Sequence, residues 1–130
     1  MNLGIKNKIR RKVTDELTAK AMGSGTLDVF ATPAMIALME ETAHTSVGAE
    51  LEQGQGSVGT MIKAEHLAAT PVGMVVECES ELIEIDGRKL VFKITATDEC
   101  GLIGKAVHER FIIDDEKFLT KAKAKLNVER

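Results

Sequence analysis

The sequence predicts an α+β domain in which a curved antiparallel sheet of about five strands packs against one long helix. The first observation is the segment at residues 33–49, which is apolar around most of its circumference at its start, as a buried helix is. The second is a two-residue hydrophobic period in the segments after Pro71, which is typical of antiparallel strands. Because such a sheet leaves unpaired edges, we also expect a homodimer.

Length and composition narrow the class of protein. A chain of 130 residues holds one hydrophobic core, so residues 1–130 are expected to form a single domain. A net charge of −3, no Trp or Tyr and only four Phe argue against a nucleic-acid partner. There is no apolar run of the roughly 18 residues that a membrane span needs, and no secretory signal follows the basic N-terminus. We therefore expect a cytoplasmic protein without a membrane partner, with its two cysteines reduced.

The first elements are a strand and the long helix. Residues 5–13 predict a short strand whose basic side chains suit a solvated sheet edge, where lysine prevents unwanted strand pairing. Thr32 directly precedes Pro33, and this pair suits an N-cap followed by proline in the first helical position. The helix is expected to continue to about Ala49. A glycine-rich turn then leads to the next strand.

The later elements form the meander. Residues 76–82 place apolar and small side chains on one face and glutamates on the other, which indicates a half-exposed strand. Asp86 and Gly87 predict a tight hairpin that returns into residues 89–97. A further strand is expected at residues 102–113. The tail begins with acidic residues and ends with basic ones, as a short terminal helix does.

A histidine occupies a core position in the strand after the helix. Counting alternately, His66 shares a side with Val58, Thr60 and Ile62, while Lys63 lies on the other side with Gly59. The charged side is the solvated one, so His66 points inward. A lone inward histidine is more often a hydrogen-bonded core residue than a catalyst, and both interpretations stay open at this point.

Glu40 is an acidic residue at a predicted apolar position of the helix. With Ile36 set at zero, Glu40 falls at about 40°, close to Val47, whereas Glu41 falls at about 140°. We therefore expect Glu40 on the apolar stripe, where burial raises the pKa of an unpartnered carboxyl group. A structural buried acid, bonded to the backbone or to His44, is an equal alternative.

Together, the helix glutamate and the strand histidine can face each other if the sheet packs on the helix, which would give an acid and a base. Thr32, at the helix start, would add a hydroxyl suited to a developing oxyanion, although simple capping explains it as well. Gly59 could let a substrate carbonyl approach a backbone N–H, or could serve only as a bulge glycine. The His108-Glu109-Arg110 segment is interpreted as a charged strand face. No spacing indicates a metal site.

Four segments carry a family resemblance: GSGTLDVFATPAMIALMEETA, GSVGTMIKAEHLAATPVGMVV, ELIEIDGRKLVFKITATDE and GKAVHERFIID. They resemble the hot-dog-fold thioesterases related to fluoroacetyl-CoA thioesterase, over nearly the whole chain. The resemblance implies a hot-dog fold, in which the curved sheet wraps the central helix. It also implies a dimer that binds acyl-CoA at the subunit interface and hydrolyses the thioester without a metal or other cofactor.

The same resemblance implies a set of site residues. Thr32, Glu40 and His66 match the catalytic threonine, glutamate and histidine of the family, and Gly59 matches a glycine whose backbone helps to hold the thioester. Selectivity for fluoroacetyl groups is linked to an aromatic lid in that family, and this sequence, which is poor in aromatic residues, offers only Phe30 near the matched threonine. Arg88 and Arg110, with Lys89, are candidates for binding the nucleotide end of CoA.

The leading hypothesis is an acyl-CoA thioesterase acting on a small or medium acyl group through Thr32, Glu40 and His66. A hot-dog enoyl-CoA hydratase or dehydratase is an enzymatic alternative, and it would hydrate enoyl-CoA instead of releasing thiol. A non-catalytic acyl-CoA binding domain is the other alternative, and it would bind CoA esters without turnover.

Overall fold

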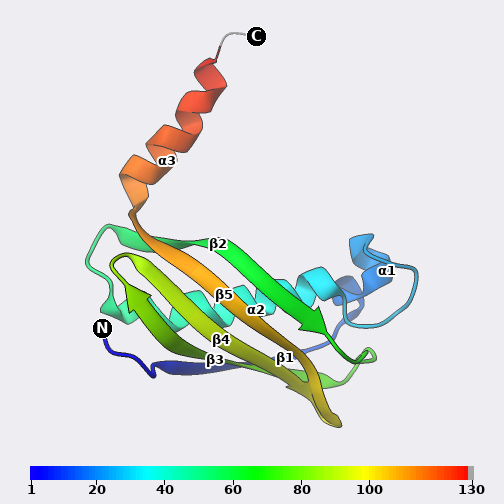
Figure 1. Ribbon diagram of the computed structural model, residues 1–130. Helices are drawn as coiled ribbons and strands as arrows, with labels where there is room; N and C mark the ends of the chain where they lie inside the picture. The colour runs from blue at the N-terminus through cyan, green and yellow to red at the C-terminus, as the bar shows by residue number, and fades with distance from the viewer. Residues whose placement is uncertain (129–130) are drawn as a thin grey trace.

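The computed structural model describes residues 1–128 and contains one antiparallel sheet with a long helix lying along one of its faces (Figure 1). The five strands lie in the order β1-β3-β4-β5-β2. Their bounds are Lys6–Lys12 for β1, Gln55–His66 for β2, Val75–Asp86 for β3, Lys89–Asp98 for β4 and Gly101–Asp114 for β5. The helices are α1 (Ala19–Met22), α2 (Thr32–Val47) and α3 (Asp115–Lys123), with 3-10 turns at Asp15–Leu17, Gly48–Glu50 and Ala124–Asn127. The predicted α+β class is confirmed.

Helix α2 begins one residue earlier than the sequence predicted. Ala31 is the N-cap, Thr32 is the first helical residue, and no side chain caps the helix start. The hydroxyl of Thr32 is therefore not used for capping, which is a correction to the predicted role. The helix ends at Val47, where a 3-10 turn takes over the last residues of the predicted span.

The buried stripe of α2 also differs from the predicted one. Its fully buried side chains include Met35, Leu38, Met39 and Val47, whereas Ile36 is only half-buried. The stripe is centred away from Ile36, so Glu40 lies at its margin, with 42% of its side chain exposed. The expectation that Glu40 enters an apolar layer is wrong. The helical angles were measured from Ile36, which lies at the edge of the face of α2 that packs on the sheet and not at its centre.

The central strands follow the predicted pattern. Val76, Cys78, Ser80 and Leu82 of β3 are fully buried, and on β4 so are Leu90, Phe92, Ile94 and Ala96. The hairpin between these strands turns at Gly87, which has a φ of 61° that favours glycine. These side chains pack on α2, so the hydrophobic core lies between the sheet and the helix.

Strand β2 contains a β-bulge that the unbroken alternation missed. Gly59 lies opposite Arg110 and Met61 lies opposite Glu109, which leaves Thr60 as an extra residue. Beyond the bulge, His66 pairs with Gly104 and keeps the predicted inward direction. The bulge reverses the assignment before it: Gly59 faces the helix, and Thr60 is exposed.

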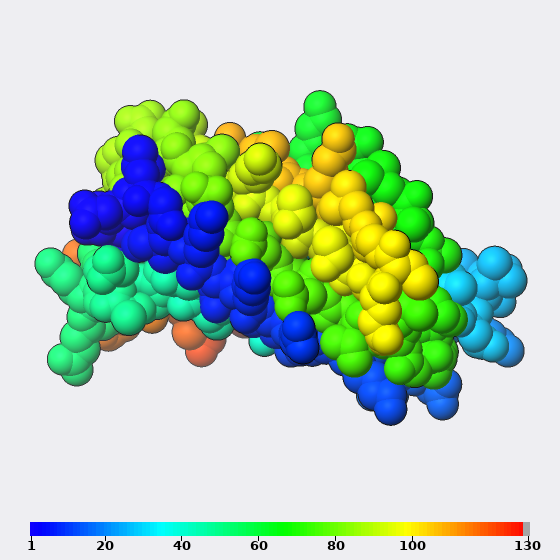
Figure 2. All heavy atoms as spheres, turned by 90° about the horizontal axis from the view of Figure 1, so that it is seen from below, coloured from blue at the N-terminus to red at the C-terminus, as the bar shows by residue number. Residues whose placement is uncertain are grey.

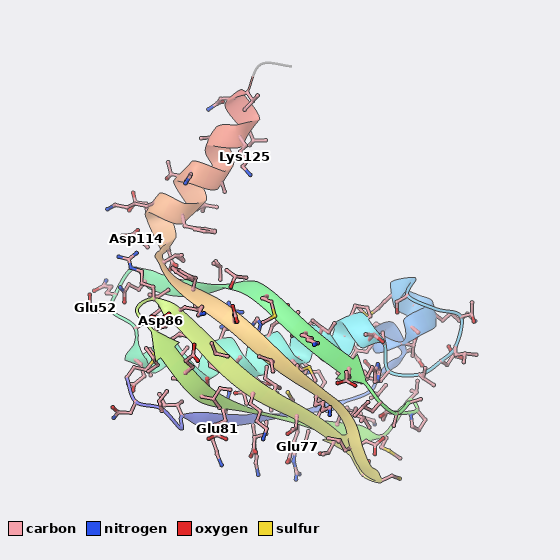
Figure 3. The ribbon with its side chains drawn as sticks, viewed as in Figure 1. Glu52, Glu77, Glu81, Asp86, Asp114 and Lys125 are labelled. Atoms are coloured by element: carbon pink, nitrogen blue, oxygen red, sulfur yellow. The ribbon has the colours of Figure 1, made fainter. Side chains whose placement is uncertain are left out.

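The two edges of the sheet differ in charge. Strand β1 runs beside β3 along one edge (Figure 2). Its basic side chains Lys8 and Arg10 form ion pairs with glutamates of β3. Glu77 and Glu81 project along this edge (Figure 3). Strand β2 forms the other edge, and among residues 1–128 it pairs with β5 alone.

Helix α3 confirms the predicted terminal helix. Asp114 caps it by accepting a hydrogen bond from the backbone N–H of Lys117. The helix stands away from the body of the molecule beyond the end of β5 (Figure 1). No helix within residues 1–128 has both the length and the apolar character needed to span a membrane.

Candidate active site

Thr32 and His66 meet where the start of α2 passes the end of β2. The hydroxyl oxygen of Thr32 lies 2.8 Å from Nδ1 of His66, which is hydrogen-bonding distance. The first turn of a helix carries a positive partial charge, so this hydroxyl sits in a field that favours negative charge on a bound group. The pair therefore joins an exposed hydroxyl to a half-buried imidazole.

The other ring nitrogen of His66 has no protein partner. Nε2 is buried and makes no hydrogen bond within residues 1–128. A buried polar atom of this kind is costly unless a ligand or water satisfies it. His66 and Thr32 also line an open pocket of about 300 Å³. The remaining lining residues are mostly small or apolar: Ala19, Ser24, Val29, Phe30, Leu67, Ala68 and Ala69.

Phe30 orients the histidine ring. The two rings contact edge to face, with their centroids 6.5 Å apart. Phe30 itself is only 1% exposed, since it belongs to the hydrophobic core. Phe30 therefore supports the pocket wall beside His66 instead of covering the pocket from outside.

Burial sets the protonation state of His66. Desolvation lowers the pKa of His66 below its ordinary value, and the backbone at Ala68 offsets part of this shift. Nε2 itself has no hydrogen-bond partner within residues 1–128. At neutral pH the ring is therefore uncharged and can accept a proton.

Glu40 lies in a different part of the same chain. Its carboxylate Oε2 is 3.7 Å from Nη1 of Arg110, on the neighbouring face of β5. It is separated from Thr32 by two turns of α2. A single chain thus joins Thr32 to His66 but holds Glu40 elsewhere, so the predicted facing of Glu40 and His66 within one chain is not observed.

Arg110 and His108 form the surroundings of Glu40. Both were interpreted as part of a charged, solvated strand face, and this interpretation is wrong, because they are 7% and 1% exposed. They lie on the helix-facing side of β5, opposite Gly59 and Ile62 of β2. Their alternation with the half-buried Glu109 was visible in the sequence, but the charges concealed which face of β5 is buried.

Gly59 leaves room for the glutamate. A Cβ atom at this position would lie 2.8 Å from Oε2 of Glu40 and 3.3 Å from Nη1 of Arg110. Both distances are shorter than ordinary contacts, so any larger residue would displace the carboxylate. The glycine is therefore explained by the close approach of Glu40, which the sequence could not reveal.

Arg88 lies far from the Thr32–His66 pair. It lies in the turn between β3 and β4, at the end of the sheet where Asp86, Asp114 and Glu52 also lie (Figure 3). His66 ends β2 at the opposite end of the sheet. No group of three or more His, Cys, Asp or Glu side chains within residues 1–128 could hold a metal ion.

Solved structures share this architecture. The fluoroacetyl-CoA thioesterase FlK superposes with a TM-score of 0.91 at 34% identity, over 96% of this chain and 97% of that chain. A variant of FlK in complex with acetyl-CoA gives a TM-score of 0.92 at 34% identity, over 96% of this chain and 98% of that chain. A thioesterase superfamily member from Thermus thermophilus gives 0.89 at 26% identity, over 98% and 97% of the two chains. The hot-dog fold is thereby confirmed.

Sequence comparisons agree. The family model described as fluoroacetyl-CoA-specific thioesterase matches residues 13–116. The fluoroacetyl-CoA thioesterase of Streptantibioticus cattleyicolor is 42% identical over 98 residues, which cover 75% of this chain and 70% of that protein. The matched region includes the pocket, the bulge in β2 and the buried residues of β5. This chain therefore belongs to the fluoroacetyl-CoA-specific thioesterase family and is a thioester hydrolase with the hot-dog fold.

Proposed function

We propose that the protein hydrolyses small or medium acyl-CoA thioesters as a homodimer, in which each catalytic site takes residues from both chains. One observation carries the proposal: Thr32 and His66 form a hydrogen-bonded pair with a buried, unsatisfied Nε2, while Glu40 is held apart from them. The pair can activate a nucleophile and bind a carbonyl oxygen. The separate carboxylate is then supplied by a second copy.

His66 is assigned the proton transfers. In the proposed arrangement Nδ1–H donates to the oxygen of Thr32, the hydroxyl of Thr32 donates to the thioester carbonyl, and Nε2 carries the lone pair that accepts a proton. Nε2 takes a proton from water, whose oxygen adds to the carbonyl carbon. The C–S bond then breaks, and the same proton passes to the departing CoA sulfur. The products are the free acid and CoA.

Thr32 is assigned the stabilisation of negative charge. The carbonyl oxygen becomes negatively charged when the nucleophile adds, and the hydroxyl donor at the start of α2 stabilises it there. Glu40 either orients the attacking water or attacks the carbonyl carbon itself. Either role requires its carboxylate within reach of the substrate beside His66.

Distance excludes Glu40 of the same chain from that role. Glu40 follows Thr32 by 40 − 32 = 8 residues, which is about 12 Å along the helix axis at about 1.5 Å per residue. Gly59, which lies under the Glu40 carboxylate, precedes His66 by 66 − 59 = 7 residues of strand, or about 20 Å. A side chain cannot bridge either span.

Strand β2 offers a way to bring the Thr32–His66 pair of one chain together with Glu40 of a second chain. It is 12 residues long, forms the sheet edge, and carries Gly59 near its middle and His66 at its end. Antiparallel pairing of two β2 edges about a two-fold axis near Ile62 would bring Gly59 of the partner subunit opposite His66. The partner's Glu40 would then lie beside the Thr32–His66 pair, and the reverse would hold in the second site.

The acyl-CoA assignment is supported by the relatives. One variant of FlK is described in complex with fluoroacetate and CoA, and another in complex with acetyl-CoA. The pocket next to His66 has small side chains at Ala19, Ala68 and Ala69, which leave space for an acyl group. Arg88 remains a prediction for the nucleotide end of CoA, because the same two-fold pairing brings its end of the sheet toward the partner's His66.

Turnover of an acyl-CoA panel tests the reaction. Release of free thiol from short and medium acyl-CoAs is the expected result, and enoyl-CoA should not be hydrated. Binding of CoA esters without thiol release would overturn the proposal.

Subunit mixing tests the shared site. His66→Ala and Glu40→Gln proteins, each expected to turn over only slowly alone, are unfolded together and refolded at equal concentrations. Random pairing makes half of the dimers mixed, and each mixed dimer has one intact site, so about a quarter of the wild-type turnover should return. Recovery of no activity would show that Glu40 does not act across the dimer.

A further inference from the structure

His108 is a buried histidine that the proposed mechanism does not use. It is 1% exposed and lies on the helix-facing side of β5, opposite Ile62 of β2. Its ring packs against Phe92 with the centroids 6.2 Å apart. Apolar packing alone would be served equally well by a leucine or phenylalanine, so the two ring nitrogens need an explanation.

The hydrogen bonds of His108 define one tautomer. Nδ1 lies 2.7 Å from the carbonyl oxygen of Met61, which can only accept, so Nδ1 carries the proton. Nε2 lies 3.2 Å from Nη1 of Arg110, which can only donate, so Nε2 carries a lone pair. The ring is therefore neutral and spans the backbone of β2 and the guanidinium of Arg110.

Arg110 is held from a second side by Ser57. Its Nε donates to the Ser57 hydroxyl and its Nη2 donates to the Ser57 carbonyl oxygen, both at 2.8 Å. Ser57 and His108 thus fix the plane of the guanidinium and leave Nη1 directed at Glu40, 3.7 Å away. Burial lowers the pKa of Arg110, but an arginine stays charged. The acceptors around the guanidinium therefore offset the cost of burying its charge.

We infer that His108 is a positioning residue for Glu40: its lone-pair nitrogen fixes Nη1 of Arg110, and Nη1 orients the carboxylate over Gly59. The inference rests on the proposed role of Glu40 in hydrolysis. Gly59 supports it, because a Cβ atom there would lie 2.8 Å from Oε2 of Glu40, 3.2 Å from Cε1 of His108 and 3.3 Å from Nη1 of Arg110. Catalytic groups require this kind of support to stay in productive geometry.

Two substitutions separate positioning from packing. His108→Gln keeps an uncharged acceptor at the place of Nε2, whereas His108→Asn is too short to reach Arg110 and retains only a donor near Met61. Losing a hydrogen bond to a charged group should lower kcat of His108→Asn roughly tenfold or more, with little change in KM. His108→Gln should recover most of that loss.

A double-mutant comparison links the effect to Glu40. If His108 acts through Glu40, His108→Asn should lower kcat in the wild-type background but not the residual turnover of Glu40→Gln. An equal fall in both backgrounds, or full kcat in His108→Asn, would overturn the inference. If Glu40→Gln itself keeps full turnover, the proposed role of Glu40 fails and the inference fails with it.

A second variant covers the case in which His108→Asn does not fold. Ser57→Ala removes the hydroxyl acceptor on the other side of Arg110 and lies on a half-buried edge strand. It should lower kcat severalfold in the wild-type background and leave the residual turnover of Glu40→Gln unchanged. Unchanged kcat in a folded Ser57→Ala protein would contradict a role for this network.

Discussion

The Thr32–His66 pair differs from the Glu40 cluster, which consists of Glu40, Arg110, His108 and Ser57, in how completely its polar atoms are hydrogen-bonded. The pair has one hydrogen bond between its members, an exposed hydroxyl and a buried ring nitrogen without a partner. In the cluster, the guanidinium beside Glu40 is bound by Ser57 and His108 before any substrate arrives. One region is left open for reacting atoms, and the other is preorganised to hold a charge. A reaction that needs both must bring them together.

The largest effect should follow from breaking the open pair at His66. His66→Ala removes the proposed base, and loss of general base catalysis should lower kcat/KM about 10³-fold. Arg10→Ala is the control, because Arg10 lies exposed on β1 and lines neither the pocket beside His66 nor the hollow beside Glu40. Steady-state thiol release measures both. A fully active His66→Ala protein would remove the pair from the mechanism.

Removing the hydroxyl of Thr32 should have the next largest effect. Thr32→Val keeps the shape of the side chain but deletes the donor, and loss of one oxyanion donor should lower kcat about 10²-fold. Thr32→Ser retains the hydroxyl and should stay within a few-fold of wild type. Since Ala31 is the N-cap, neither variant removes a cap, and their thermal midpoints should be similar. Equal kcat in the two variants would contradict the assignment.

Filling the space at Gly59 tests the preorganised cluster. Gly59→Ala places a methyl group against the Glu40 carboxylate, so kcat should fall roughly tenfold as the carboxylate is displaced. Gly48→Ala is the control, because nothing lies within 4 Å of its added Cβ and its backbone is helical. That control should keep full kcat and gain up to about 1 kcal/mol of stability. Full activity of Gly59→Ala would show that the carboxylate position is unimportant.

The pH profile sharpens the difference between the regions. Burial lowers the pKa of His66, so the proposed base stays neutral below the ordinary histidine value of 6.5. The acidic limb of kcat/KM should therefore lie below pH 6.5. The stability of the fold should change with pH in the same direction as the activity. Because the pKa of His66 is lower in the folded state than in the unfolded state, the contribution of His66 to stability is present above its unfolded-state pKa and is lost as the pH falls through its folded-state pKa. An acidic limb above 6.5 would require a different base.

Much of the fold could be predicted because its local signals agree with its tertiary contacts. The alternation in β3 and β4 identified the buried face, and Asp86-Gly87 identified the hairpin. The single bulge in β2 could not be predicted, since a two-residue period assigns faces correctly only while no residue is added. That is why His66 was assigned correctly and Gly59 was not.

The candidate site was harder to predict for a different reason. Periodicity on one helix gave the position of Glu40 relative to its neighbours but not the centre of the buried stripe. The polar character of His108 and Arg110 concealed their burial, because such side chains are usually exposed, and here they are buried with hydrogen bonds to each other, to Met61 and to Ser57. In the proposed dimer, the residues of one site come from two copies, so their proximity would leave no spacing pattern within one sequence.

The smallest expected effect is that of substituting Glu41, which is adjacent to Glu40 in the sequence but has a different partner. Glu41 accepts two hydrogen bonds from Arg11 of β1, and this contact lowers the pKa of Glu41. The pair is more than a third exposed, so Glu41→Gln should cost only about 0.5 kcal/mol in unfolding free energy and leave kcat unchanged. The difference from wild type should vanish as pH falls through the lowered pKa of Glu41, because the wild-type carboxylate then protonates. Denaturant unfolding at several pH values measures this difference in stability. A loss of turnover in Glu41→Gln would contradict the assignment of Glu40 to catalysis and of Glu41 to the ion pair with Arg11, because both acids would then act on the substrate.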